Sequence, residues 1–162
     1  MTENQTSTIR NCARAVIVRD GAILLLCKQS PSYGMRYALP GGAQEESETL
    51  QAALIRECEE EIGTTISVDD LMHVADFFKP KNTYPDTKRH TIEFLFRCSV
   101  PDGYVLANGP APDKNQKDVL WLPLTDLPGA PLFPNDLRAV LAARAPEDPA
   151  YQAHPVYLGQ IT

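Results

Sequence analysis

The sequence predicts one domain of the α/β (α+β) class, with a mixed β-sheet sandwiched between helices. Two observations lead to this fold class: segments with strand character outnumber helical ones, and the two kinds are not regularly interleaved. The chain has 162 residues, 43% of them hydrophobic, so it can bury one core of ordinary size. The expected boundaries are an N-terminal extension over 1–10, a domain over 11–145 and a C-terminal tail over 146–162.

The predicted sheet begins with a hairpin and a short third strand. Two apolar segments, 12–19 and 22–28, are separated by an Asp-Gly dipeptide, which is typical of a tight hairpin turn. A short strand is expected over 37–39. The Pro-Gly-Gly sequence at 40–42 is then expected to break regular structure.

A helix is expected over 49–62. Leu50, Leu54 and Ile62 belong to an apolar set that recurs at helical spacing, and Gly63 is a natural stop. The remaining expected elements are strands over 71–78, 91–100 and 119–122, a second helix over 135–143 and an edge strand at 156–158.

Composition and cysteine usage argue against several classes of protein. No apolar run approaches the roughly 18 residues that a membrane-spanning helix needs, and the polar N-terminus lacks the layout of a secretory signal. A cytoplasmic protein is therefore expected. The cysteines are far apart and form no Cys-x-x-Cys pair, so we expect reduced thiols rather than the two disulfides that their even number allows. They are Cys12, Cys27, Cys58 and Cys98.

The net charge of −6 argues against a nucleic-acid-binding protein, whose affinity would depend on an excess of lysine and arginine. The acidic excess lies in one short stretch, 45–61, which contains seven glutamates and a single base, Arg56. The rest of the chain has equal numbers of acidic and basic residues. One segment therefore carries the whole net charge.

Three of these glutamates share one face of the predicted helix. Glu57, Glu60 and Glu61 stand at positions i, i+3 and i+4, where like charges destabilise a helix unless a cation lies among them. Carboxylate oxygens favour Mg²⁺ or Mn²⁺. The glycines at 41–42 allow backbone to approach a metal or ligand closely. A solvated acidic face, with Arg56 paired to Glu60, is the structural alternative.

A longer sequence pattern favours a metal site over a solvated acidic face. Gly42 is followed after five residues by Glu48, and after seven more by Arg-Glu-Cys-Glu-Glu-Glu-Ile-Gly-Thr at 56–64. This resembles the Nudix box, G-x5-E-x7-R-E-U-x-E-E-x-G-U, in which U is a bulky aliphatic residue. Every fixed position matches, whereas Cys58 and Thr64 stand where the family prefers larger aliphatic residues. The chain thus resembles MutT-like and ADP-ribose pyrophosphatase-like Nudix domains, which implies the Nudix fold.

The resemblance implies a Mg²⁺-dependent pyrophosphohydrolase. Such an enzyme cleaves the diphosphate linkage of a nucleoside diphosphate derivative: ADP-ribose, a nucleotide sugar, a nucleoside triphosphate or a dinucleoside polyphosphate. By position in the box, Glu57, Glu60 and Glu61 would be metal ligands, with Mn²⁺ as an alternative metal. Gly41 would contribute its carbonyl, and Arg56 would hold a box carboxylate in position.

The roles of the other carboxylates stay open. Glu48 is expected either to support the loop or a metal-bound water, or to pair with the dipole at the helix N-terminus. The general base is expected to be Glu57 or Glu93. Asp113 and Asp118 are further candidates, although ordinary solvated loop residues would have the same pattern. Glu93 interrupts an apolar strand and would face away from its apolar neighbours, or it is simply an exposed strand residue.

Substrate contacts are expected from Arg36 and from the polar loop 79–90. This loop is rich in basic and aromatic residues, which can hold a terminal phosphate or stack a base, although a solvated loop has the same composition. The candidate contacts are Arg36, Lys81, Tyr84, Arg89 and His90, with Tyr33, Tyr37, Lys79 and Lys88 nearby.

Two alternatives to this enzyme remain at the level of sequence. A Nudix-fold sensor or interaction module without turnover would be expected to lose box carboxylates, and this chain keeps them all. An isomerase of prenyl diphosphates would need further catalytic cysteine and glutamate positions, for which no motif is found. The expected partner is a small molecule rather than nucleic acid or a membrane, and homodimers are common among the proteins it resembles.

Overall fold

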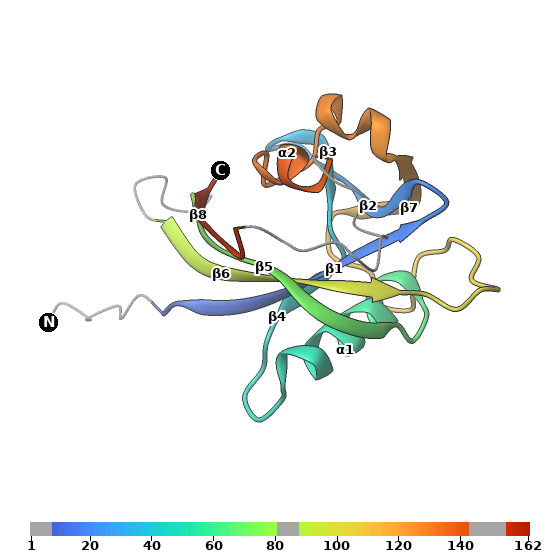
Figure 1. The fold of residues 1–162 in the computed structure, drawn as a ribbon, viewed down its shortest axis with the longest axis horizontal. Coiled ribbons are helices and arrows are strands. Elements are labelled where there is room, and N and C mark those ends of the chain that lie inside the picture. Colours follow the sequence, from blue (N-terminus) through green and yellow to red (C-terminus); the bar gives the residue numbers. More distant parts are fainter. Residues whose placement is uncertain (1–7, 81–87, 143–154) are drawn as a thin grey trace, which may run out of the picture.

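The computed structural model describes residues 8–80, 88–142 and 155–162. These residues form a mixed sheet with helices on both sides, which confirms the predicted fold class (Figure 1). The strands are β1 (Arg10–Arg19), β2 (Ala22–Ser30), β3 (Gly34–Ala38), β4 (Gly41–Ala43), β5 (Ser67–Pro80), β6 (Lys88–Ser99), β7 (Gln116–Pro123) and β8 (Tyr157–Ile161). The helices are α1 (Leu50–Ile62), a 3₁₀ helix (Leu124–Gly129) and α2 (Leu137–Ala142).

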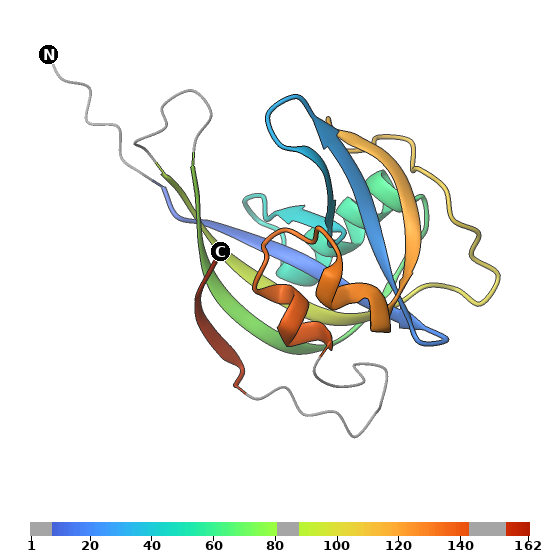
Figure 2. The same ribbon diagram turned by 90° about the horizontal axis from the view of Figure 1, so that it is seen from above.

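The strand order is β3-β2-β1-β6-β5-β8, with β4 paired to β1 and β7 paired to β2. β1 runs parallel to β6 and β8 runs parallel to β5, whereas the other pairs are antiparallel. β1 connects the two parts of the sheet, because its last residues pair with β2 and its earlier residues pair with β6. Figure 2 shows β2 and β7 turning away from the direction of β5 and β6.

Two hydrophobic clusters lie on the two sides of the sheet because successive strand residues point to opposite faces. Leu54, Cys58 and Ile62 of α1 belong to one cluster, together with alternate residues of β1 such as Ala13 and Ala15. Leu137 and Leu141 of α2 belong to the other, together with Met72 and Leu95. Each helix therefore covers its own face of the sheet.

The predicted hairpin and first helix are confirmed. Val18 pairs with Ile23 across the hairpin, and both turn residues have positive φ, as a tight turn requires. The Thr49 hydroxyl caps α1 by accepting a hydrogen bond from the Ala52 N–H at 3.0 Å. Gly63 ends the helix with φ of 71°.

The predicted break of regular structure at 40–42 is wrong. Gly41 begins β4, which pairs with the start of β1, and Gly42 stands opposite Ala13. Glycine permits this pairing, since Gly41 has φ of 133° and a Cβ there would lie 2.0 Å from the Ala13 carbonyl oxygen. The glycines therefore bring the chain against β1 instead of ending the sheet.

The predicted polar loop 79–90 is too long. Lys79 pairs with Arg89, and the β5–β6 hairpin continues to the Pro80 and Lys88 pair. Polar side chains do not prevent this, because strand pairing depends on backbone hydrogen bonds. Residues 81–87 lie outside the described part of the chain.

The end of the described chain adds an edge strand, as predicted. Tyr157 in β8 pairs with Val74 of β5, so a segment expected in the C-terminal tail completes the sheet. The 3₁₀ helix after β7 was not predicted. Among the residues that the structure describes, no helix has the length and apolar character needed to cross a membrane.

Candidate active site

The acidic residues of α1 lie beside β4, with one arginine among them. The Arg56 guanidinium donates hydrogen bonds to Glu48 at 2.8 Å, to Glu57 at 3.0 Å and to the Ala43 carbonyl at 3.2 Å. Its distance to the nearest Glu60 oxygen is 3.7 Å. The hydrogen bond from Arg56 lowers the pKa of Glu48 below its usual value. Arg56 thus ties the loop before α1 to the helix.

Glu61 is the buried member of the acidic set. It is 3% exposed, and its carboxylate accepts a hydrogen bond from the Gly41 N–H at 2.9 Å. Burial raises its pKa to about 8, although the Gly41 hydrogen bond and the charges of Arg14 and Lys28 act in the opposite direction. Within the described residues, no basic group forms an ion pair with this carboxylate.

Gly42 provides space for another carboxylate of the same helix. A Cβ at this position would lie 2.5 Å from the carboxyl carbon of Glu57. A glycine is therefore required for Glu57 to pack against β4 in this way. The pair of glycines has two different effects: Gly41 binds Glu61 through its N–H, and Gly42 leaves room for Glu57.

The described residues contain no group of three His, Cys, Asp or Glu side chains placed to hold a metal ion. Glu57 and Glu60 lie toward Arg56, whereas Glu61 lies against Gly41, so the expected three carboxylates do not meet at one point. The donor chemistry nevertheless suits a hard divalent cation, since it offers carboxylate oxygens and the Gly41 carbonyl. A buried carboxylate without an ion-pair partner also gains stability from such a cation.

Arg14 connects this acidic site to the strands, and the sequence analysis did not identify it. Its Nε donates to Glu93 at 3.0 Å and its Nη1 donates to the Gly41 carbonyl at 2.9 Å. Burial opposes the charge of Arg14, but the adjacent Glu93 raises its pKa above the usual value. The only signal in the sequence was a cation inside an otherwise apolar strand.

Glu93 is buried, so its interpretation as an exposed strand residue is wrong. It is 4% exposed, and its second oxygen accepts a hydrogen bond from the Thr91 hydroxyl at 3.1 Å. As predicted, it faces away from Phe94 and Phe96, which pack in the cluster under α1. The hydrogen bonds of Glu61, Gly41, Arg14 and Glu93 form one continuous chain from the helix to β6.

Glu93 and Arg14 line a pocket that also contains two of the expected substrate contacts, Arg36 and Arg89. His90 does not line it. Neighbouring strand residues point to opposite faces, so His90 lies on the other side of the sheet, where its ring nitrogen is 2.6 Å from Asp76. Lys81 and Tyr84 lie outside the described residues.

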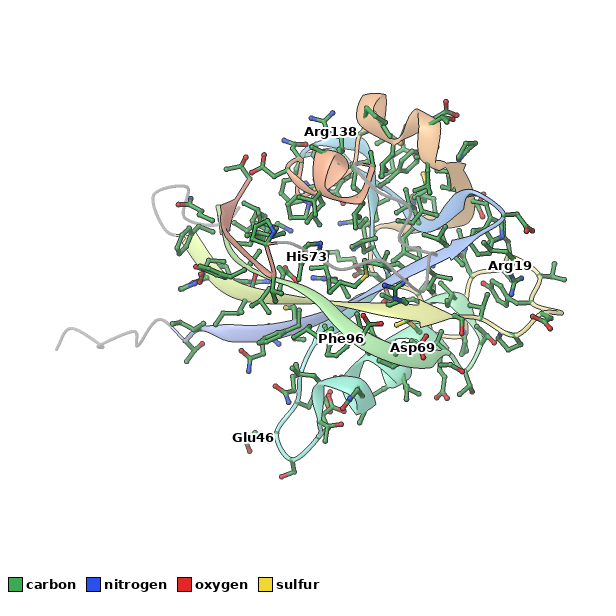
Figure 3. The ribbon with its side chains drawn as sticks, in the orientation of Figure 1. Arg19, Glu46, Asp69, His73, Phe96 and Arg138 are labelled. Atoms are coloured by element: carbon green, nitrogen blue, oxygen red, sulfur yellow. The ribbon has the colours of Figure 1, made fainter. Side chains whose placement is uncertain are left out.

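The two further acidic candidates lie near β7. Asp113 forms an ion pair with Lys28, which lines the pocket. Asp118 is exposed, and its carboxylate accepts a hydrogen bond from the Val119 N–H at 2.8 Å. Figure 3 shows Glu46, an exposed member of the acidic stretch, at the outer end of the loop before α1. The described part of the acidic stretch therefore includes both members of the site and exposed residues outside it.

Comparisons with known proteins find a family match and similar proteins over most of the chain. The family model described as NUDIX domain matches residues 9–143. A curated relative, an ADP-ribose pyrophosphatase from Methanocaldococcus jannaschii, is 32% identical over 108 residues, which are 67% of this chain and 61% of that protein. The chain thus spans less than two thirds of that relative's length.

Solved structures show the same fold. The solution structure of the E. coli ORF135 protein has a TM-score of 0.59 and 26% identity, and the match covers 89% of this chain and 96% of that one. The crystal structure of a MutT NUDIX hydrolase from Burkholderia pseudomallei has a TM-score of 0.60 and 28% identity, covering 81% and 95%.

Proposed function

Because the chain belongs to the NUDIX domain family, we propose that it is a Mg²⁺-dependent pyrophosphohydrolase that cleaves the diphosphate linkage of a nucleoside diphosphate derivative. The proposal depends mainly on one observation: the buried Glu61 carboxylate, which lies against Gly41 without an ion-pair partner among the described residues. Burying a carboxylate without a counter-charge is costly, and a divalent cation supplies that charge. The substrate candidates are ADP-ribose, nucleotide sugars, nucleoside triphosphates and dinucleoside polyphosphates.

Glu57, Glu60 and Glu61 would hold the metal, with the Gly41 carbonyl as a further ligand. When bound, Mg²⁺ or Mn²⁺ neutralises charge on the phosphoryl oxygens and lowers the pKa of water. Arg56 would position Glu57, because it already donates to that carboxylate and to the loop residue Glu48. Glu48 would thereby connect the loop to the helix.

Two carboxylates are proposed as the general base, Glu57 and Glu93. Each accepts a hydrogen bond from an arginine, so neither is distinguished by its partner type. Glu93 is the more constrained, since both of its oxygens already accept hydrogen bonds. A pH profile of kcat for Glu93→Gln separates the two: loss of the acidic limb identifies Glu93, because a general base is inactive when protonated, whereas a lower plateau with the same limb leaves Glu57.

The test is product analysis after incubation with Mg²⁺ and the four substrate classes. We expect cleavage at the diphosphate in at least one class and a fall of about a hundredfold in kcat/KM for Glu60→Gln. Glu59→Gln is the matched control, because Glu59 is exposed on the same helix and its carboxylate accepts a hydrogen bond from the Thr65 hydroxyl rather than from Arg56 or Gly41. Binding of a nucleotide without turnover would contradict the proposal and favour a sensor.

A further inference from the structure

The pocket beside Glu93 collects basic side chains from separate strands. Arg14 comes from β1, Lys28 from β2, Arg36 from β3, Lys79 from β5 and Arg89 from β6. Glu93 is the single acidic residue among those that line it. In a chain with a net charge of −6, this local excess of positive charge requires an explanation.

Two of the five cations have carboxylate partners. Arg14 pairs with Glu93 and Lys28 pairs with Asp113. Within the described part of the chain, Arg36, Lys79 and Arg89 form no ion pair with a carboxylate. Their three charges face one pocket, and no carboxylate among the described residues compensates them.

Aromatic rings hold Arg36 in place. The centre of its guanidinium lies 3.5 Å from the Tyr33 ring and 4.0 Å from the Phe133 ring. Contact with two rings at these distances fixes the position of the guanidinium. A guanidinium held in this way can donate N–H hydrogen bonds to an oxyanion.

The neighbouring cations repel the charge of Lys79. Burial lowers its pKa, and the charges of Arg36, Lys28, Arg89 and Arg14 lower it further. A polyanion in the pocket would reverse this repulsion. Most of the other lining residues, among them Phe77, Phe133 and Leu137, are apolar and strengthen electrostatic attraction by excluding water.

We propose that this pocket binds an ionised phosphomonoester of the substrate, separate from the diphosphate that is cleaved. The proposal rests on the proposed function for the identity of the substrate. The two sites adjoin at Gly41, whose N–H donates to Glu61 and whose carbonyl accepts from the pocket residue Arg14. A phosphomonoester carries up to two negative charges near neutral pH, which suits three uncompensated cations.

The first experiment needs no turnover. Inorganic phosphate is titrated into the metal-free protein by NMR, in the wild type, Lys79→Gln, Arg89→Gln and Lys117→Gln. We expect the first two substitutions to weaken binding about tenfold. Lys117→Gln should bind as the wild type does, because Lys117 is exposed on β7 away from the pocket lining. Equal binding by all four proteins would overturn the proposal.

The second experiment links the pocket to specificity. Values of kcat/KM are compared for pairs that differ in one phosphomonoester, NAD⁺ with NADP⁺ and dephospho-coenzyme A with coenzyme A. We expect about a tenfold preference for the phosphorylated member of at least one pair, abolished in Lys79→Gln. If neither pair shows a preference, the proposed specificity for a substrate with a phosphomonoester is overturned.

Glu60→Gln distinguishes the two proposals. It should lose turnover but retain the binding of inorganic phosphate, because Glu60 does not line the pocket. If phosphate binds and no substrate is cleaved by the wild type, the proposed function fails while the pocket stands. If substrates are cleaved and phosphate does not bind, the pocket assignment fails alone.

Discussion

The acidic face of α1 and the cationic pocket have opposite charges but a similar construction. Each contains a single residue of the opposite sign, Arg56 among the glutamates and Glu93 among the basic residues. In both regions this residue donates or accepts several hydrogen bonds at once. The lone counter-charge therefore positions its neighbours without neutralising the region, which leaves one site suited to a cation and the other to an anion.

The largest expected effect is on the stability of the metal-free protein and comes from the acidic face of α1. Because the pKa of Glu61 is raised to about 8 in the fold, the folded protein binds more protons than the unfolded chain between about pH 4.5 and 8. Stability should therefore be highest at the acidic end of this window and fall as pH rises through it, by on the order of 5 kcal/mol.

Urea denaturation in the presence of a chelator measures this slope. Glu61→Gln should remove the slope, whereas Glu59→Gln should keep it, since Glu59 is exposed. Adding Mg²⁺ at pH 8 should restore stability in the wild type, because the cation binds the ionised carboxylate. A flat profile for the wild type would show that Glu61 is not a desolvated carboxylate.

The second effect tests the space that Gly42 provides. In Gly42→Ala the new Cβ overlaps the Glu57 carboxyl group, which must move, while the backbone needs no unusual φ. We expect kcat/KM to fall about a hundredfold with little change in melting temperature. Gly103→Ala is the control, because nothing lies within 4 Å of its new Cβ. Equal activities would mean that the position of Glu57 is unimportant.

A third, smaller effect concerns Arg56, the single basic residue on the acidic face of α1. Arg56→Lys keeps the charge but loses the planar group that reaches Glu48, Glu57 and the Ala43 carbonyl together. Activity should fall about tenfold, with a higher Mg²⁺ concentration needed for half-maximal rate. Unchanged Mg²⁺ dependence would indicate that the charge alone matters.

The smallest effect concerns the counter-charge of the pocket. Glu93→Gln removes the only acidic residue of the lining and frees the charge of Arg14. Inorganic phosphate should then bind about threefold more tightly, because one repulsive charge is lost. Weaker binding in this variant would break the comparison between the two regions.

The acidic face of α1 could be predicted because its residues are close in sequence. The capping threonine, the terminal glycine and the glutamates all belong to one helix and the loop before it, where spacing alone fixes the shared face. The metal-ligand roles of Glu57, Glu60 and Glu61 stay predictions. The sequence could not predict that Glu57 and Glu60 lie near Arg56 while Glu61 lies against Gly41, since the side-chain rotamers depend on contacts with β4.

The pocket could not be predicted, because five separate strands each contribute one cation and only their pairing brings these side chains together. Arg36 was proposed from its position just before the glycines at 41–42 and Arg89 from the composition of its loop, whereas Arg14 and Lys28 were missed. His90, another candidate contact, does not line the pocket, because adjacent residues of a strand point to opposite faces of the sheet. The loop before it was also predicted too long, since a polar segment still pairs through its backbone.

A titration with Mn²⁺ tests the central claim most directly, because free Mn²⁺ is counted by its EPR signal and no turnover is needed. The wild type, Glu60→Gln and Glu59→Gln are compared in the presence of a non-hydrolysable nucleoside diphosphate analogue. The account predicts that Glu60→Gln binds Mn²⁺ about tenfold more weakly, while Glu59→Gln matches the wild type. Equal Mn²⁺ affinity in all three proteins would contradict a metal site on the acidic face of α1.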